Sequence, residues 1–203
     1  ELGGAAAADI SATAIQAFYA HVHGGADRSI LEQAITLAHS NVKNLRITSK
    51  LSSMGTTVVG AVIANDQIAF GAVGDSRAYR VRSSGVEQIT HDHTVVQAMV
   101  DRGEITPDEA LVHPYSHVLT SCLGSEEGFE INSSSFFIDR KSGLEGDYIL
   151  LCSDGLYSLV SEVEISEIVC NFSPDEAAER FISLARERGG FDNITAIVID
   201  IGG

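Results

Sequence analysis

The sequence predicts an α+β fold built as a single domain over residues 1–203. Two observations indicate this fold class. The spacing of apolar residues switches between the helical and the strand period several times, and no linker, internal repeat or low-complexity tract interrupts the chain. The 203 residues, 44% of them hydrophobic, are enough to bury one sizeable core. The order of the elements favours strands in hairpins with helices as outer layers.

The N-terminal part of the chain predicts two helices. Apolar residues recur at helical spacing over residues 5–21 and again over residues 30–45. Gly24-Gly25 marks the loop between them.

The pattern then changes to three β-rich runs, at residues 56–63, 67–73 and 78–82. Asn65-Asp66 between the first two is a hairpin signal. We therefore expect an antiparallel meander of three strands.

The second half of the chain alternates between helical and strand patterns. Residues 94–112 have helical periodicity. Within them Thr106-Pro107 predicts a helix start, as Ser173-Pro174 does further on, because the hydroxyl can cap and proline suits the first turn. The later elements are expected in the order strand 135–138, strand 148–152, helix 161–170, helix 174–188 and strand 195–201.

Composition narrows the class of protein. Thirteen Lys and Arg against 28 Asp and Glu give a formal net charge of −15, which argues against a nucleic-acid partner. No run approaches the roughly 18 apolar residues of a membrane span, so we expect no membrane partner and a cytoplasmic location. Cys122, Cys152 and Cys170 have neither disulfide-framework nor zinc-site spacing and are expected to be buried thiols in a reducing compartment.

Three aspartates carry the functional signal: Asp75, Asp154 and Asp192 each lie at an end of an apolar run, beside a glycine or an asparagine. If the fold brings them to one sheet end, their carboxylates suit hard cations such as Mg²⁺ or Mn²⁺. The implied chemistry is metal-assisted attack by water. The sequence has neither a GxSxG serine elbow nor a GxxxxGK phosphate loop, which disfavours the corresponding mechanisms.

Each of these residues also has an ordinary structural explanation. Asp154 suits the cap of a following helix, Asp192 suits a plain turn with Asn193, and Asp75 suits a salt bridge with Arg77 or a turn hydrogen bond. The occurrence of all three at strand ends favours the metal interpretation.

The histidines are weaker candidates. His91-Asp92-His93 resembles a ligand cluster, but no further Cys or His at ligand spacing supports it, and a polar loop is the favoured interpretation. His113 and His117 follow the helical segment and are candidates for substrate contact, with ordinary loop histidines as the alternative.

Several segments occur together in an order that resembles the metal-dependent protein phosphatases, the type 2C serine/threonine phosphatases, and particularly their compact bacterial members. The resemblance covers nearly the whole chain and implies a four-layer α-β-β-α sandwich of two antiparallel sheets flanked by helices, with a metal cluster in a cleft at one end. The matching segments are Met54-Gly55-Thr56-Thr57, Gly74-Asp75-Ser76-Arg77, Asp92-His93-Thr94-Val95-Val96, Gly103-Glu104-Ile105-Thr106-Pro107, His113-Pro114, Leu151-Cys152-Ser153-Asp154-Gly155-Leu156 and Gly190-Phe191-Asp192-Asn193-Ile194-Thr195.

The resemblance also implies roles. Asp154 and Asp192 correspond to ligands of two core Mg²⁺ or Mn²⁺ ions, and Asp75 with Asp154 corresponds to the site of a third, weaker ion. Residues 93–117 correspond to a flap beside the active site. The implied reaction is attack of a metal-bridging water on phosphoserine or phosphothreonine of a protein substrate, opposing a Ser/Thr kinase.

The chain departs from the family pattern at its start. Glu1-Leu2-Gly3-Gly4-Ala5 aligns with the end of an Asp-Gly-Met-Gly-Gly-His-like motif, so the metal-bridging aspartate falls before residue 1 and Ala5 replaces the histidine. The expectation is an N-terminally incomplete domain in which the backbone carbonyl of Glu1 still binds metal. Two hypotheses follow: an active phosphatase, and a pseudophosphatase-type binding or regulatory module with an impaired metal site.

Overall fold

The computed structural model describes residues 2–21, 27–50, 54–64, 66–138 and 147–201. Two antiparallel sheets lie face to face, with strand orders β1-β2-β5 and β4-β3-β6-β7. The strands are β1 (Val58–Ala64), β2 (Gln67–Val73), β3 (Arg77–Arg82), β4 (Gly85–Gln88), β5 (Asn132–Phe137), β6 (Tyr148–Cys152) and β7 (Ala196–Asp200).

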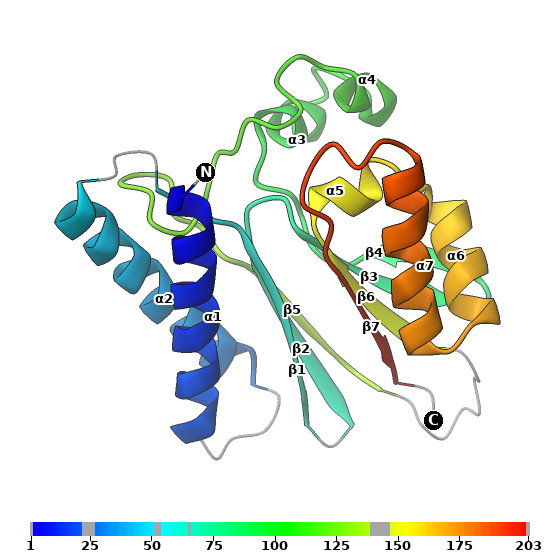
Figure 1. Ribbon diagram of the computed structural model, residues 1–203, viewed down its shortest axis with the longest axis horizontal. Helices are drawn as coiled ribbons and strands as arrows, with labels where there is room; N and C mark the ends of the chain where they lie inside the picture. The colour runs from blue at the N-terminus through cyan, green and yellow to red at the C-terminus, as the bar shows by residue number, and fades with distance from the viewer. Residues whose placement is uncertain (1, 22–26, 51–53, 65, 139–146, 202–203) are drawn as a thin grey trace.

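Helices cover the outer face of each sheet, so the molecule has four layers (Figure 1). The pair α1 and α2 lies on the smaller sheet, and the pair α6 and α7 lies on the larger one. This arrangement confirms the predicted α+β sandwich. The helices are α1 (Leu2–His21), α2 (Arg28–Ser49), α3 (Val95–Asp101), α4 (Pro107–Leu111), α5 (Asp154–Tyr157), α6 (Glu162–Asn171) and α7 (Pro174–Glu187).

The predicted helix starts at Thr106 and Ser173 are confirmed. Each residue caps its helix, α4 or α7, in a capping box with the glutamate three positions later, and a proline follows the cap. The predicted Gly24-Gly25 loop lies outside the described residues, as does Asn65 of the hairpin signal.

The predicted three-strand meander is wrong, because β3 belongs to the other sheet. β1 and β2 pair as expected, from Val58 with Val73 to Ala64 with Gln67. After β2 the chain turns at Gly74, whose φ of 101° favours glycine and where a Cβ would lie 2.4 Å from a methyl carbon of Thr57. The turn carries β3 into the second sheet, between β4 and β6.

Two further strand predictions need correction. β4, which follows β3 in a hairpin, was not predicted, because its four residues carry no strong apolar pattern. β5 begins at Asn132 rather than Ser135, since its polar first half is recruited by pairing with β2.

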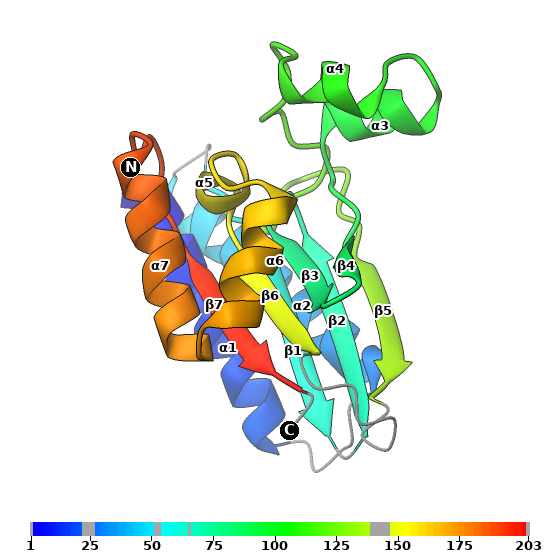
Figure 2. The same cartoon turned by 90° about the vertical axis from the view of Figure 1, so that its right-hand side faces the viewer.

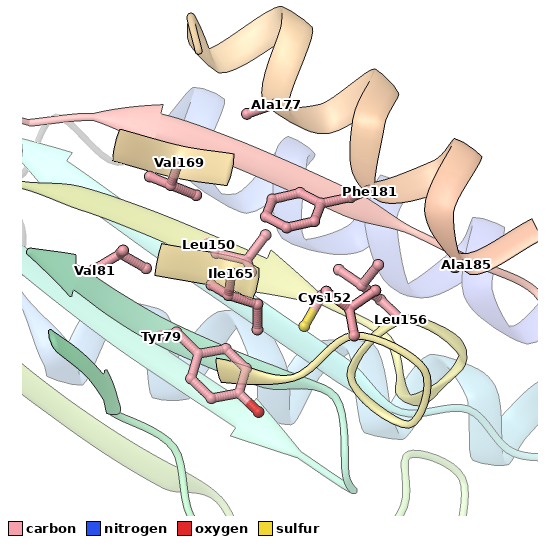
Figure 3. Close-up of a cluster of buried hydrophobic side chains, with 11 residues drawn as sticks. Tyr79, Val81, Leu150, Cys152, Leu156, Ile165, Val169, Ala177, Phe181 and Ala185 are labelled. Atoms are coloured by element: carbon pink, nitrogen blue, oxygen red, sulfur yellow. The ribbon is translucent and has the colours of Figure 1, made fainter. Parts of the chain in front are cut away.

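Alternation along the strands divides the core into layers. On β6, Ile149 and Leu151 face the smaller sheet, whereas Leu150 and Cys152 face the helices. Figure 3 shows the helix-covered cluster, in which Phe181 of α7 lies against Leu150. This buried packing fixes the position of the β6 end, from which α5 begins.

The cysteines only partly follow the prediction of buried thiols. All three are free; Cys152 is buried, Cys122 is half-buried and Cys170 is exposed. Cys170 lies near the end of α6 with an exposed side chain, whereas Ile165 and Val169 of the same helix pack into the core. Within the described residues, no helix is long and apolar enough to cross a membrane.

Residues 93–117, the flap segment, project from the sandwich with α3 and α4 (Figure 2). They stand at the same end of the molecule as α5. Their base is held by backbone hydrogen bonds from His93 to Gly74, 2.9 Å, and from Thr120 to His93, 2.8 Å. The flap segment is therefore anchored beside the turn that carries Asp75.

Candidate metal centre

An open cleft of about 1070 Å³ lies at this end of the sandwich. The first turns of α1, the start of β1, the end of β6 and the loop before β7 line it. Asp154 and Asp192 both face the cleft, together with Ser76, which follows Asp75, and with Gly4 and Ala5 from α1. The fold thus gathers five parts of the sequence around one hollow.

Asp154 is the first residue of α5, directly after β6. Ser153 occupies the N-cap position without a side-chain cap hydrogen bond, and the Asp154 Oδ1 accepts a hydrogen bond from the Gly155 amide over 2.8 Å. The Asp154 side chain is 28% exposed. It is therefore neither the N-cap residue nor a buried ion-pair partner, which leaves its second oxygen available to the cleft.

Asp192 is brought beside Asp154 by two local features. The Ser153 hydroxyl donates to the Asn193 carbonyl over 3.1 Å and accepts from the Thr195 amide over 3.0 Å. Gly155 allows the close approach, because a Cβ there would lie 2.4 Å from the Asn193 carbonyl oxygen and 3.5 Å from the Asp192 Cβ.

Asp75 is buried in the turn after β2, 7% exposed. Burial, together with the negative charges of Asp154 and Asp92, raises the pKa of its carboxyl to about 6. Asp75 does not form the salt bridge with Arg77 that was its structural alternative, since Arg77 pairs with Asp92.

The Arg77–Asp92 pair is a part of the site that sequence reasoning missed. Nε and Nη2 of Arg77 donate to the Asp92 carboxylate over 2.7 to 3.0 Å. Nη1 donates to the Tyr79 hydroxyl over 2.9 Å, and the guanidinium lies 3.7 Å from the centre of the Tyr157 ring. The only available signal was Arg77 in the Gly-Asp-Ser-Arg segment, which does not reveal its partner.

The histidines near Asp92 do not converge on a ligand position, in agreement with the polar-loop interpretation. His93 is buried, and its Nδ1 accepts a hydrogen bond from the Gly74 amide over 3.1 Å. Burial lowers the pKa of His93, which keeps this acceptor unprotonated. His91 instead lies at the surface, 2.9 Å from Asp101.

The structure separates the two flap histidines. The Nδ1 of His117 lies 3.9 Å from the Asp154 Oδ2, with a side chain that is 72% exposed. His113 accepts a hydrogen bond from the Tyr115 amide over 3.1 Å and packs on the Tyr115 ring. His117 is therefore at the site, whereas His113 is engaged within the flap segment. Glu1 lies outside the described residues.

The carboxylate oxygens gathered here are of the donor type that suits a hard cation. Asp92 and Asp154 are close enough to Asp75 to raise its pKa, and Arg77 is already paired with Asp92. Neither Asp154 nor Asp192 has a Lys or Arg partner within the described ranges, so negative charge accumulates there without compensation. In the same part of the chain no three His, Cys, Asp or Glu side chains form a group that could hold a metal by themselves.

Known sequences and structures that are similar to this chain identify its family. The family model for protein phosphatase 2C matches residues 1–99. A crystal structure of the Mycobacterium tuberculosis serine/threonine phosphatase PstP/Ppp superimposes with a TM-score of 0.84 and 34% identity, over 99% of this chain and 85% of that one. The chain belongs to the protein phosphatase 2C family.

Membership in the protein phosphatase 2C family confirms the resemblance inferred from the motifs. A structure of the PstP catalytic domain in complex with two manganese ions is also similar, with a TM-score of 0.83 and 32% identity over 97% of this chain and 81% of that one. The curated PstP sequence of M. tuberculosis is 34% identical over 98% of this chain. This chain covers only 39% of the length of PstP.

Proposed function

We propose that this chain acts as a metal-dependent protein phosphatase that hydrolyses phosphoserine and phosphothreonine. The observation that carries the proposal is that Asp154 and Asp192 line the same cleft, where neither carboxylate has a Lys or Arg partner among the described residues. The family's named serine/threonine phosphatases, and the manganese in one related structure, support the same reaction class.

The residues would divide the work as follows. Asp154 and Asp192 hold two Mg²⁺ or Mn²⁺ ions, and Asp75 with Asp154 holds a third, more weakly. The Glu1 carbonyl remains a proposed ligand. Bound cations of this kind supply a water of lowered pKa and neutralise charge on the phosphoryl group. Ser153 and Gly155 keep the two ligand-bearing segments at a constant separation.

The substrate would be a phosphorylated protein, with a Ser/Thr kinase acting in the opposite direction in the cytoplasm. The 1070 Å³ cleft is open rather than enclosed, as a site for a side chain on a polypeptide requires. The flap segment would contact the substrate through His117, whose Nδ1 lies 3.9 Å from the Asp154 Oδ2.

A second candidate is a pseudophosphatase that uses the same cleft to bind a partner without turnover. Two observations favour it: Ala5 stands at the cleft where the resemblance places a histidine, and the described residues contain no three-residue metal group. This candidate predicts partner binding with no metal-dependent phosphate release.

The deciding experiment is phosphate release from a phosphothreonine peptide by the full-length protein, with Mn²⁺ and with EDTA. Asp154→Asn should abolish release while leaving the unfolding transition intact. Asp175→Asn, at an exposed position in the first turn of α7, is the matched control and should leave release unchanged. Undiminished release by Asp154→Asn would refute the metal assignment, and no release by a folded parent would favour the pseudophosphatase.

A further inference from the structure

A second, smaller hollow of about 280 Å³ lies beside the proposed metal ligands. Its lining includes His117 of the flap segment and Phe191, which directly precedes Asp192. Gly155, Ser158 and Leu159 of the α5 region also line it. Neither the metal site nor the proposed reaction requires Phe191, yet 86% of this residue is exposed.

The position of Phe191 is set by a glycine. A Cβ at Gly189 would lie 2.3 Å from the ring Cζ and 2.6 Å from a ring Cε, so the ring rests directly over the Gly189 backbone. Gly189 has φ 117°, a conformation that glycine adopts readily. A single exposed apolar residue is ordinary on a protein surface. Here, however, the Phe191 ring packs against the Gly189 backbone and lines a hollow that Asp154 and Asp192 also line.

The chemistry of the lining selects the occupant. Asp154 and Asp192 also border the hollow, but in the proposed function their charge is taken up by cations. What remains is largely apolar, namely the Phe191 ring, the Leu159 side chain and the Gly155 backbone, with the Ser158 hydroxyl and the His117 imidazole as its polar members. An apolar side chain would bury surface here against Phe191 and Leu159, whereas a charged side chain would lose part of its hydration.

We propose that Phe191 and Leu159, together with His117, form a subsite for an apolar side chain next to the phosphorylated residue of the substrate. This inference rests on the proposed phosphatase function, because the phosphoryl group must sit at Asp154 and Asp192 for its neighbour to reach the hollow. Phe191 is then a specificity-determining residue, and the subsite favours substrates with an apolar residue beside phosphoserine or phosphothreonine.

The test compares two phosphothreonine peptides that differ only in the residues flanking phosphothreonine, leucine on both sides or serine on both sides. For each enzyme the ratio of kcat/KM for the two peptides is measured with Mn²⁺. The parent should prefer the leucine peptide, and Phe191→Ala should reduce the ratio roughly tenfold, equivalent to about 1.4 kcal/mol. Phe191→Leu should keep most of the parent's kcat/KM ratio, because leucine still offers apolar surface.

Using the ratio separates specificity from damage to the site. A disturbance of Asp192 would lower kcat/KM for both peptides equally and leave the ratio unchanged. Phe137→Ala is the matched control, because Phe137 is also exposed, at 76%, but pairs with Gln67 at the far end of β2 from Asp75. Phe137→Ala should leave kcat/KM unchanged for both peptides.

Two results would overturn the subsite inference and leave the proposed function standing. One is a parent that hydrolyses both peptides without preference, and the other is a preference that persists in Phe191→Ala. A folded parent that releases no phosphate from either peptide would instead contradict the proposed function, and the subsite would fall with it.

Discussion

The Ser153 hydroxyl donates a hydrogen bond to the backbone carbonyl of Asn193 across a sequence separation of 40 residues. The same oxygen accepts from the Thr195 amide, so one side chain joins the end of β6 to the loop before β7. Asp154 and Asp192 are the immediate neighbours of the joined residues. The hydroxyl thus adds to the backbone hydrogen bond from the Ser153 amide to the Thr195 carbonyl, 3.2 Å, in holding the segments of the two proposed ligands together, and no ion pair among the described residues links the ligands.

Removing that hydroxyl should loosen the metal site. We expect Ser153→Ala to weaken Mn²⁺ binding about tenfold, as loss of an outer-shell hydrogen bond to a metal site commonly does. Calorimetric titration of Mn²⁺ into the metal-free protein measures the change directly. Ser84→Ala, at an exposed position in the turn between β3 and β4, is the control and should bind like the parent. Equal affinities for parent and Ser153→Ala would show that the hydroxyl does not position the ligands.

Gly155 should tolerate no side chain. Its Cβ would lie 2.4 Å from the Asn193 carbonyl oxygen, a backbone atom that cannot rotate away. Gly155→Ala should therefore push the two ligand loops apart and destabilise the protein by about 1 to 3 kcal/mol. The measurement is urea unfolding. At Gly60, in β1, a Cβ would have no heavy atom within 4 Å, so Gly60→Ala should change stability far less. Similar losses in both variants would contradict the steric argument.

Loss of the buried Arg77–Asp92 ion pair should lower the free energy of unfolding strongly. The Asp92 side chain is only 6% exposed, so Arg77→Ala leaves a buried carboxylate without its partner. The expected loss is about 3 to 5 kcal/mol in urea unfolding at neutral pH. Arg82 and Glu87 form an exposed ion pair, with side chains 37% and 59% exposed, and Arg82→Ala should cost less than about 1 kcal/mol. Comparable losses for the two arginines would refute the distinction.

Asp75 should give the metal-free protein a characteristic pH dependence. Its pKa is raised from 3.8 to about 6, so the folded protein holds the proton more tightly than the unfolded chain. Stability should fall as pH rises through this interval and stay reduced above it. In EDTA, Asp75→Asn should be more stable than the parent by about 1 to 3 kcal/mol at pH 8, with a smaller difference at pH 5.

The opposite order of stability is expected with Mn²⁺ present at pH 8, because the Asp75 carboxylate then contributes to cation binding. Urea unfolding of parent and variant at both pH values, with EDTA and with Mn²⁺, provides the comparison. A stability difference in EDTA that does not grow with pH would show that Asp75 is not destabilised by ionisation.

Local patterns were sufficient for much of the fold. The helical spacing of α2 and α7, the caps at Thr106 and Ser173 and the apolar run of β6 all appear in the structure because each depends on neighbours in sequence. The incorrect predictions concern how the strands are arranged in sheets. β3 was assigned to the wrong sheet and β4 was missed, since sheet membership depends on pairing between strands and not on the strand's own residues.

By itself the sequence determined the family and the α+β class, and it singled out three aspartates as candidate ligands, because motifs and strand ends are properties of contiguous residues. Only the tertiary structure decided that Ser153 joins the loops of Asp154 and Asp192, and that Arg77 pairs with Asp92 rather than with Asp75. These relationships arise from distances between distant segments. Such distances are set by how the two sheets pack and turn, and no single stretch of sequence encodes them.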